Sequence, residues 1–281
     1  MEIKEQLTNL IEKNKAKIKF ASFSDETIVL AHNLLNDKCS NPELFITEGM
    51  WAIPKIIFNK CEVVAFIFNP NCIKSASGLN AVKHFVGKTN VFVISDKVLN
   101  RLTKRNDDNG IYCIVKLPTY NYEKILSKTN SIVCVLDGIE KPGNIGTILR
   151  TCDATQIDMV MIVNKRAKVT NTLCVKGSMG GIFNVPIKQY ASVKDCWREL
   201  NNFGYTIYLA DTRAETDYFK FNYAQKTALV MGSERYGISK DWYETPHTLL
   251  KLKMLGQCDS LNVGVATSVL LYDIKMKQLG E

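Results

Sequence analysis

The sequence predicts an α/β protein in which a small α/β domain precedes a second domain built on a mainly parallel sheet. Three observations favour this fold class. The chain has 281 residues, more than one domain usually needs. In its second half, apolar strand-like runs alternate with helical stretches. Three of those runs lead into a glycine-bearing loop and then a helix, the junction at which open α/β sheets bind ligands.

The first part of the chain contains short β-branched and aromatic runs bounded by turn residues, which are typical of strands. Helical segments separate these runs. The expected strands are residues 62–68, 90–94 and 111–115, and the expected helices are residues 51–58 and 98–102. Together they predict a small α/β domain over residues 1–118.

Proline, asparagine and threonine then interrupt the periodicity at residues 117–122, Leu-Pro-Thr-Tyr-Asn-Tyr. We expect a linker over residues 119–130 and a second domain over residues 131–281. The buried-strand runs of that domain are residues 132–136, 159–163, 205–209, 228–231 and 249–252. Because helical stretches lie between them, they predict a mainly parallel sheet covered by helices on both faces.

The composition is that of a globular protein with an excess of positive charge. Lys and Arg number 36 against 28 Asp and Glu, and the net charge of +8 would either attract a polyanion or serve only solubility. No apolar run approaches the length of a membrane span, and the N-terminus lacks the apolar core of a secretion signal. The nine cysteines include no Cys-x-x-Cys pair, and the three histidines are widely spaced. We therefore expect buried free thiols in a reducing cytoplasm, no metal site and no membrane association.

The first glycine-bearing loop opens a helix with the sequence Asn-Ile-Gly-Thr-Ile-Leu-Arg at residues 144–150. Asn144 can cap this helix, and Gly146 lies one turn before Arg150. Without a side chain at Gly146, the Arg150 guanidinium would be free to lean over a substrate. The alternative is a capped helix with a surface arginine, because short motifs often mislead.

The second loop has the sequence Gly-Ser-Glu-Arg-Tyr-Gly-Ile at residues 232–238. Glu234 lies between two glycines, where the backbone of a loop can approach a ligand closely. It could accept hydrogen bonds from a ribose, a base or Arg150. Alternatively, it is a first-turn glutamate favoured by the helix dipole.

The third loop has the sequence Ser-Leu-Asn-Val at residues 260–263 and precedes an amphipathic helix. Ser260 suits a helix cap and Asn262 suits a side chain that orders the loop. Both residue types also suit a substrate site, so this motif alone does not decide between structure and function.

In order, spacing and strand context, the three motifs together resemble those of the SpoU-type (TrmH-like) methyltransferases of the SPOUT superfamily. The resemblance covers the chain from residue 132 to the C-terminus. It implies transfer of a methyl group from S-adenosylmethionine to a ribose 2′-hydroxyl of RNA, with S-adenosylhomocysteine as the product. It also implies a deep trefoil knot at the C-terminal end of the sheet, which composition alone does not show.

The loops of such a knot form the cofactor pocket. By position, the resemblance implies that Gly232, Leu252 and Leu261 surround the adenosyl group, with Met254, Leu209 and Ala210 as weaker candidates. Lys253 stands where relatives have proline, and this departure bears on the rigidity of the loop.

The resemblance makes Arg150 the principal catalytic residue, with Asn144, Glu234, Ser260 and Asn262 arranging it and the ribose. Methyl transfer requires alignment of the hydroxyl oxygen and help with its deprotonation. Because arginine stays protonated, we expect Arg150 to hold the RNA phosphate and the hydroxyl. That phosphate or Glu234 would then accept the proton.

Residues 44–50 and 98–115 resemble the small ribosomal-protein-like RNA-binding domain that many such enzymes carry before the knot. This domain would select the RNA. Each candidate phosphate contact has a solvated surface position as its alternative. The candidates are Lys55, Arg101 and Arg105 in the first domain and Lys165, Arg166 and Lys176 in the second.

The whole layout is similar to that of the thiostrepton-resistance group, which methylates large-subunit ribosomal RNA. The expected substrate is therefore 23S ribosomal RNA, and the family implies a homodimer through the knotted domains. That group has Ala-Ser-Arg-Gly where residues 177–180 are Gly-Ser-Met-Gly. Met179 thus replaces an arginine that reaches the substrate from the neighbouring subunit, and Lys176 or the cluster at residues 165–166 would have to substitute for it. Drug resistance is not inferred.

Two alternatives remain. One is the same chemistry on transfer RNA, and the other is an RNA-binding protein that keeps the fold without catalysis. The presence of Arg150, Glu234, Ser260 and Asn262 argues against the second. A nucleotide-binding oxidoreductase is excluded, because no Gly-x-Gly-x-x-Gly follows a strand.

Overall fold

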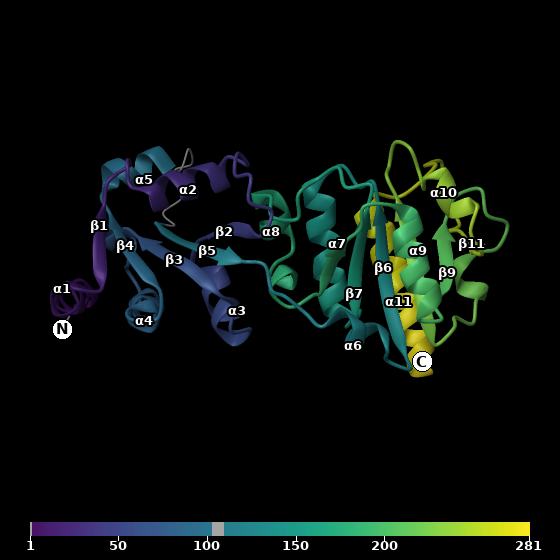
Figure 1. Cartoon of the computed structure of the whole chain (residues 1–281), viewed down its shortest axis with the longest axis horizontal. Helices are drawn as coiled ribbons and strands as arrows, with labels where there is room; N and C mark the ends of the chain where they lie inside the picture. The colour runs from purple at the N-terminus through teal and green to yellow at the C-terminus, as the bar shows by residue number, and fades with distance from the viewer. Residues whose placement is uncertain (1, 103–109) are drawn as a thin grey trace. The chain divides into compact units, whose positions relative to one another are not determined.

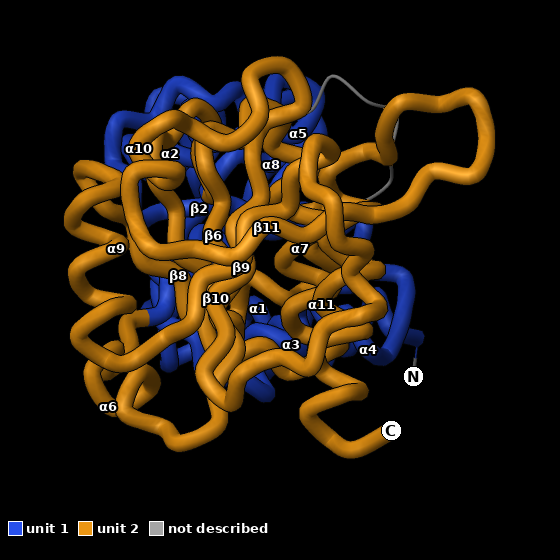
Figure 2. The backbone as a smooth tube through the Cα atoms, turned by 90° about the vertical axis from the view of Figure 1, so that its right-hand side faces the viewer, with its two compact units in different colours: residues 1–118, 170–175 blue, residues 119–169, 176–281 orange. Residues whose placement is uncertain are grey.

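The computed structural model describes residues 2–102 and 110–281 and consists of two compact units. The first unit comprises residues 1–118 together with 170–175, and the second comprises residues 119–169 together with 176–281 (Figures 1 and 2). Within the described ranges, no helix is long and apolar enough to cross a bilayer.

The first unit contains a five-stranded mixed sheet in the order β1-β4-β3-β5-β2. The strands β1, β4 and β3 run parallel, whereas β5 is antiparallel to both of its neighbours. The strands are β1 (Ile18–Ala21), β2 (Leu44–Glu48), β3 (Val63–Phe68), β4 (Asn90–Ile94) and β5 (Ile111–Lys116). The sequence predicts β3, β4 and β5 but neither β2 nor β1, and β1 has four residues of which one is buried.

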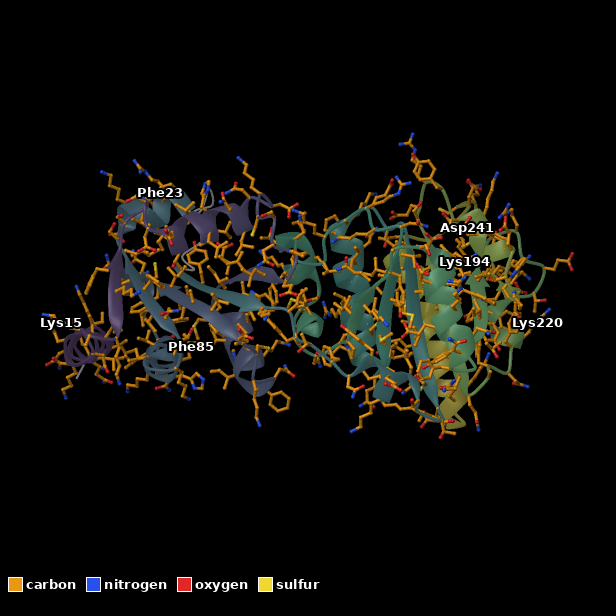
Figure 3. The ribbon with its side chains drawn as sticks, in the orientation of Figure 1. Lys15, Phe23, Phe85, Lys194, Lys220 and Asp241 are labelled. Atoms are coloured by element: carbon orange, nitrogen blue, oxygen red, sulfur yellow. The ribbon has the colours of Figure 1, made fainter. Side chains whose placement is uncertain are left out.

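Helices on both faces of this sheet complete the first unit. They are α1 (Ile3–Lys13), α2 (Glu26–Leu35), η1 (Met50–Ala52), α3 (Ile53–Phe58), η2 (Pro70–Cys72), α4 (Ala76–Phe85) and α5 (Asp96–Leu102). On one face, Ile28 of α2 and Leu99 of α5 share a core with Ile67 of β3. Phe85 lies at the end of α4 (Figure 3). Its ring stacks on that of Phe66 in β3, with the two ring centroids 4.6 Å apart. The sequence-predicted helices at 51–58 and 98–102 therefore correspond to η1 with α3 and to α5.

The second unit contains a six-stranded sheet in the order β11-β9-β10-β6-β7-β8, and every adjacent pair is parallel. The strands are β6 (Ser131–Asp137), β7 (Met159–Val163), β8 (Ile187–Gln189), β9 (Thr206–Ala210), β10 (Lys226–Gly232) and β11 (Thr248–Leu250). The prediction of a mainly parallel sheet is confirmed. The edge strand β8, with three residues, is too short to produce a recognisable pattern.

Helices cover both faces of this sheet, as the alternating pattern predicts (Figure 2). They are α6 (Tyr122–Leu126), α7 (Pro142–Ala154), η3 (Gly181–Phe183), α9 (Val193–Asn202), η4 (Tyr218–Lys220), α10 (Lys240–Tyr243) and α11 (Val263–Leu279). The helix α8 (Thr172–Gly177) is divided, because residues 172–175 belong to the first unit and residues 176–177 to the second. Leu126 of α6, Cys196 of α9 and Trp242 of α10 share a core with Val133 of β6. On the other face, α7 and α11 pack together, and the thiol of Cys152 in α7 meets Cys134 of β6.

The segment expected to be a linker, residues 119–130, is instead part of the second unit. The side chain of Asn121 accepts a hydrogen bond from the Lys124 N–H and caps α6. Leu126 is buried, and the Tyr122 hydroxyl donates to the Ile187 carbonyl at 2.7 Å. Proline and asparagine before the helix mark its start rather than a flexible connection.

All nine cysteines are free. Five of them are buried, as expected for apolar thiols, and burial raises the pKa of Cys113 and Cys174 above the usual range. Cys258 is exposed, so the expectation of burial is wrong at this position.

Candidate active site

The three sequence motifs meet at the carboxyl ends of β6 and β10, in the middle of the second sheet. From β6 the chain proceeds outward through β7 and β8 on one side, whereas β10 and β9 lie on the other. Such a reversal of strand order is where open α/β sheets bind ligands. The two strands pair in parallel as far as Asp137 and Gly232, so the loops that follow them begin side by side.

The loop after β10, residues 233–237, is closed by two backbone hydrogen bonds. The Ser233 N–H donates to the Gly237 carbonyl at 3.0 Å, and the Gly237 N–H donates back at 2.9 Å. Gly237 has φ +69°, a conformation that favours glycine. A Cβ atom at Gly232 would lie 2.3 Å from the carbonyl carbon of Gly237. Both glycines are therefore needed for the loop to fold back tightly and leave its three apical side chains exposed.

Asn144, Glu234 and Asn262 form a hydrogen-bonded cluster that joins the three motifs. Asn144 Nδ2 donates to Glu234 Oε1 at 2.5 Å, and Asn262 Nδ2 donates to that oxygen and to Asn144 Oδ1, each at 3.2 Å. Within the described chain, Glu234 Oε2 has no hydrogen-bond partner. The cluster thus fixes one carboxylate oxygen and leaves the other available to a substrate.

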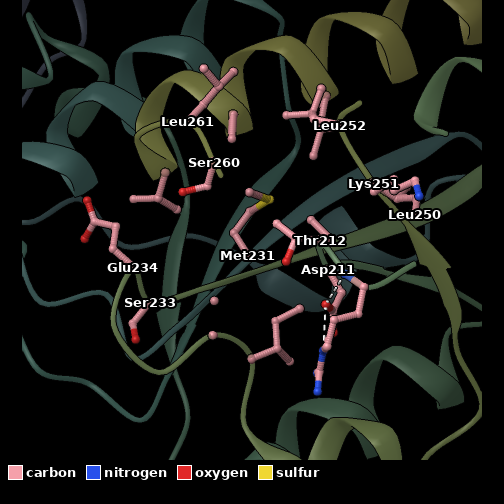
Figure 4. A pocket seen from close by; sticks show the side chains of 18 of the residues that line it. Asp211, Thr212, Met231, Ser233, Glu234, Leu250, Lys251, Leu252, Ser260 and Leu261 are labelled. Atoms are coloured by element: carbon pink, nitrogen blue, oxygen red, sulfur yellow. Dashed lines mark hydrogen bonds and ion pairs between the residues drawn. The ribbon is translucent and has the colours of Figure 1, made fainter. Parts of the chain in front are cut away.

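The two asparagines take different roles at their helices from those the sequence suggests. Lys141 is the N-cap of α7, so the expectation that Asn144 caps this helix is wrong. Asn262 caps α11, because its Oδ1 accepts a hydrogen bond from the Gly264 N–H at 3.0 Å. Its amide nitrogen is thereby turned toward Glu234. Ser260 is exposed in the same loop and lies beside Leu261 at the edge of the pocket (Figure 4).

Arg150 lies on α7 but outside this cluster. Its side chain is exposed and makes no hydrogen bond or ion pair with any described residue. Six residues separate it from Asn144, about 240° around a helix, so the two side chains leave the axis in different directions. The space at Gly146 is occupied by Gly177, where a Cβ would lie 3.5 Å from the Gly146 Cα. The glycine therefore serves close packing rather than the freedom of Arg150 that the sequence suggests.

A cavity of about 450 Å³ lies between the loops after β9, β10 and β11 (Figure 4). Five of the six residues expected around the adenosyl group line it: Gly232, Leu252, Leu261, Met254 and Ala210. Leu209 does not, because it is fully buried in the core on the α9 face of the sheet. Ala210 is the last residue of β9 and points to the face opposite that of Leu209. Glu234 and Ser260 also line it.

Sequence reasoning missed Asp211, Arg213 and Tyr243, which form a polar wall of this cavity. Arg213 donates to Asp211 through Nε at 3.1 Å and Nη2 at 2.7 Å, and the Tyr243 hydroxyl donates to the same carboxylate. The Arg213 hydrogen bonds lower the pKa of Asp211 to about 2, and burial raises the pKa of Tyr243. The one sequence signal for these residues was their position, because Asp-Thr-Arg at residues 211–213 directly follows the carboxyl end of a strand.

The candidate RNA-binding residues are divided between the two units. Lys165 and Arg166 follow β7 and line a second cavity of about 350 Å³ beside the first. Lys176 is exposed on α8, and Lys55 is exposed on α3. Arg101 is exposed on α5 with its guanidinium 5.4 Å from the ring of Phe23. Arg105 lies outside the described residues.

Two departures from the family pattern have clear positions. Met179 is 44% exposed and has φ +46°, in the left-handed region between α8 and Gly180. Lys253 is exposed in the segment between β11 and α11. That segment is anchored at its start, where the Tyr218 N–H donates to the Lys251 carbonyl at 2.8 Å and the Lys251 N–H to the Thr216 carbonyl at 3.1 Å. These bonds hold the start of the segment, two residues before Lys253.

The described residues contain no group of three or more His, Cys, Asp or Glu side chains that could hold a metal ion.

Comparisons with known proteins identify sequences and structures that are similar to this chain. Residues 131–272, about half of the chain, match the SpoU rRNA Methylase family. An uncharacterized tRNA/rRNA methyltransferase of Borreliella burgdorferi is 31% identical over 195 residues, which cover 65% of this chain and 85% of that protein. A TrmH family tRNA/rRNA methyltransferase of Staphylococcus haemolyticus is 35% identical over 153 residues, which cover 54% of this chain and 61% of that protein.

The fold matches solved structures over nearly its full length. One match is the SpoU methyltransferase AviRb from Streptomyces viridochromogenes, solved in complex with AdoMet, with a TM-score of 0.81. The matched region covers 91% of this chain and 98% of the AviRb chain. The two sequences are 20% identical, so this likeness is one of fold.

Proposed function

Because this chain belongs to the SpoU rRNA Methylase family, we propose that it transfers a methyl group from S-adenosylmethionine to a ribose 2′-hydroxyl of RNA, with 23S ribosomal RNA as the substrate. The observation that carries the proposal is the cluster of Asn144, Glu234 and Asn262 at the edge of the cavity lined by Gly232 and Leu261. Methyl transfer to a hydroxyl requires alignment of the oxygen and a group that accepts its proton, and a fixed carboxylate beside a pocket of cofactor size can supply both.

The cavity fits S-adenosylmethionine in size and chemistry. Its volume of about 450 Å³ is within the range of cofactor sites. Leu252 and Leu261 offer apolar surface for an adenine, and Arg213 and Asp259 offer opposite charges for the amino acid group. When bound, the cofactor supplies an activated sulfonium methyl group. Gly232 lets the backbone of Gly237 pack against the strand end, and both glycines line the cavity.

Glu234 orients the ribose in this proposal. Its Oε1 is held by two amide donors and its Oε2 is open, so the carboxylate can accept a hydrogen bond from the 2′-hydroxyl in one defined direction. The same oxygen can take the hydroxyl proton, as can a phosphate of the RNA. Ser260, at the rim, can donate to the ribose or the phosphate.

Arg150 is proposed as the residue that holds the RNA phosphate and the 2′-hydroxyl. Its guanidinium is exposed and uncommitted in the described chain, which suits a group whose partner arrives with the substrate. It cannot act as a base, because it stays protonated. Its contribution is therefore alignment and neutralisation of charge.

A homodimer is proposed from the surface of α11. Val265, Tyr272 and Leu279 are 48%, 45% and 60% exposed and recur every seven residues, so they form one apolar stripe along the helix. Monomers rarely leave such a stripe uncovered. The trefoil knot and the selection of RNA by the first unit stay predictions.

The experiment is methyl transfer from tritiated S-adenosylmethionine to purified RNA, followed by mapping of 2′-O-methyl positions. Ribosomal RNA from cells that lack the protein should accept label at one ribose, and RNA from cells that have it should not. If only transfer RNA is labelled, the proposed substrate is wrong but the proposed 2′-O-methyl transfer still holds. Binding of RNA without any label would favour the catalytically inactive alternative.

A further inference from the structure

Tyr236 stands at the apex of the loop 233–237 with cations beside its ring. Its side chain is 58% exposed. The guanidinium of Arg166 lies 4.9 Å from the ring centroid and that of Arg235 lies 5.1 Å from it, both within the range of cation–π attraction. The Tyr236 N–H donates to Ser233 Oγ at 3.0 Å. The ring is thus held on a rigid loop while remaining open to solvent.

The second cavity lies against this ring. Besides Tyr236 and Arg166 it is lined by Lys165, Asn164 and the buried Asp137. Three of its lining residues, Ser233, Tyr236 and Gly237, also line the cofactor cavity. The loop 233–237 is therefore a wall common to the two cavities.

The lining of the second cavity has two cationic side chains, Lys165 and Arg166, and one carboxylate, Asp137. Asp137 is buried, and it accepts hydrogen bonds from Asn164 Nδ2, the Ser239 N–H and the Ser239 hydroxyl, each at 2.7 Å. Arg166 forms an ion pair with Glu140, with 3.4 Å between Arg166 Nη1 and Glu140 Oε1. Lys165 makes no ion pair or hydrogen bond with any residue of the described ranges. An anion entering the cavity would therefore meet Lys165 and Arg166.

We propose that this second cavity binds the nucleotide next to the methylated ribose, with its base stacked on Tyr236 and its phosphate held by Lys165 and Arg166. This assignment rests on the proposed RNA methyltransferase function and adds a substrate subsite to it. Glu234 and Tyr236 are two residues apart in one loop, so a ribose at Glu234 brings the adjoining nucleotide to the ring. Exposed bases of unpaired RNA stack on aromatic side chains and guanidinium planes.

The chemistry favours stacking over recognition of one particular base. Every base has a π face, and stacking contributes binding with little dependence on sequence. Tyr236 and the arginines supply such a surface, and Lys165 supplies a point charge for phosphate. The subsite therefore selects a nucleotide that is unpaired rather than one of defined identity.

The test compares Tyr236→Ala, Tyr236→Phe and a control, Phe219→Ala, in the full chain. Phe219 is 51% exposed and lines neither cavity. The probe is a single-stranded RNA of randomised sequence, carrying 4-thiouridine for photocrosslinking, with affinity measured by fluorescence anisotropy. Tyr236→Ala should weaken RNA binding by about 5-fold to 100-fold, whereas Tyr236→Phe and Phe219→Ala should bind within twofold of the wild type. The crosslinked peptide should contain residue 236.

Three outcomes would overturn the subsite. The first is unchanged RNA affinity in Tyr236→Ala, and the second is an equal loss in Tyr236→Phe, since that variant keeps the ring. The third is a crosslink elsewhere. Calorimetric titration with S-adenosylmethionine and the methyl transfer assay separate this failure from that of the proposed function. If the wild type methylates RNA and Tyr236→Ala methylates it with the same KM for RNA, only the proposed subsite is contradicted. A wild-type protein that binds no S-adenosylmethionine contradicts the proposed function itself.

Discussion

Asn144 and Glu234 are 90 residues apart in the chain, yet the side-chain amide of Asn144 donates to the Glu234 carboxylate at 2.5 Å. The pair connects the loop after β6 to the loop after β10, and Asn262 adds the segment before α11. The position of the candidate catalytic carboxylate is thus set by residues from two other parts of the sequence.

Replacing Asn144 with Asp should reduce methyl transfer by more than about tenfold, because a carboxylate would replace the donor and repel Glu234. S-adenosylmethionine affinity should stay within twofold, because Asn144 does not line the cavity. The measurement is kcat with saturating cofactor. Asn184→Asp is the matched control, since Asn184 Nδ2 donates to Asp153 at 2.6 Å outside the site. If both variants lose activity equally, the role of Asn144 is structural.

Arg150→Ala should abolish methylation with little effect on folding. The side chain is exposed and has no partner in the described chain, so the free energy of unfolding should change by no more than about 0.5 kcal/mol. Urea unfolding and calorimetric titration with the cofactor would check this, with Arg198→Ala on α9 as an exposed control. An active Arg150→Ala enzyme would refute the catalytic role.

Gly232→Ala should eliminate cofactor binding and lower the melting temperature. The added Cβ would lie 2.3 Å from the backbone of Gly237, so the loop 233–237 would have to move away from the strand end. Gly256→Ala is the matched control in the neighbouring segment, because a Cβ there meets no atom within 4 Å. Differential scanning fluorimetry with and without S-adenosylmethionine measures both effects. A normal cofactor shift in Gly232→Ala would contradict the close packing.

Asp211 should make stability depend on pH in the acid range. The hydrogen bonds from Arg213 lower its pKa from 3.8 to about 2. Because the folded-state pKa is the lower one, the ionised carboxylate stabilises the fold above pH 3.8, and this contribution is lost as pH falls toward about 2. Asp211→Asn should be less stable than the wild type at neutral pH, and the difference should shrink across that window.

The measurement for Asp211 is the free energy of unfolding in urea at a series of pH values. Asp241→Asn, at an exposed position on α10, should follow the wild-type curve. A constant difference between Asp211→Asn and the wild type from pH 7 to pH 2 would show that its ionisation is not coupled to folding.

A charge on the apolar stripe of α11 should separate the proposed homodimer. Val265→Asp and Tyr272→Asp place carboxylates on the stripe, where burial against a second copy would desolvate them. Analytical ultracentrifugation should show monomers at concentrations where the wild type is dimeric. Phe58→Asp changes an exposed aromatic residue of α3 in the first unit and should leave the dimer intact. If the wild-type protein sediments as a monomer, the proposed homodimer is wrong.

Local sequence pattern predicted the central strands because each is a long run of buried residues. All seven residues of β6 and all five of β7 are buried, so an apolar run is a sufficient signal for them. The short edge strand β8 has the pattern Ile-Lys-Gln with no buried residue, and no periodicity marks it. Helix α6 was missed because Pro118 and Asn121 are typical both of linkers and of helix starts.

Site residues that directly follow a strand within one motif were predicted. Hydrogen bonds between residues far apart in the sequence were not. Gly232 and Glu234 follow directly from the loop after β10. The hydrogen bond from Asn144 to Glu234 requires the parallel register of β6 and β10, which no local pattern contains. Asp211 and Arg213 line the cavity together with Tyr243, which is 32 residues after Asp211 and donates a hydrogen bond to its carboxylate. Leu209 and Ala210 could not be told apart without knowing which strand face the cavity occupies.

The five-residue turn closed by Ser233 and Gly237 separates the two cavities. A displacement of this turn by either ligand necessarily alters the surface offered to the other. Thermodynamic linkage then requires that donor and acceptor change each other's dissociation constants by one and the same factor. If the first ligand shifts the turn, the affinity of the other cavity for the second ligand would change, whichever ligand binds first.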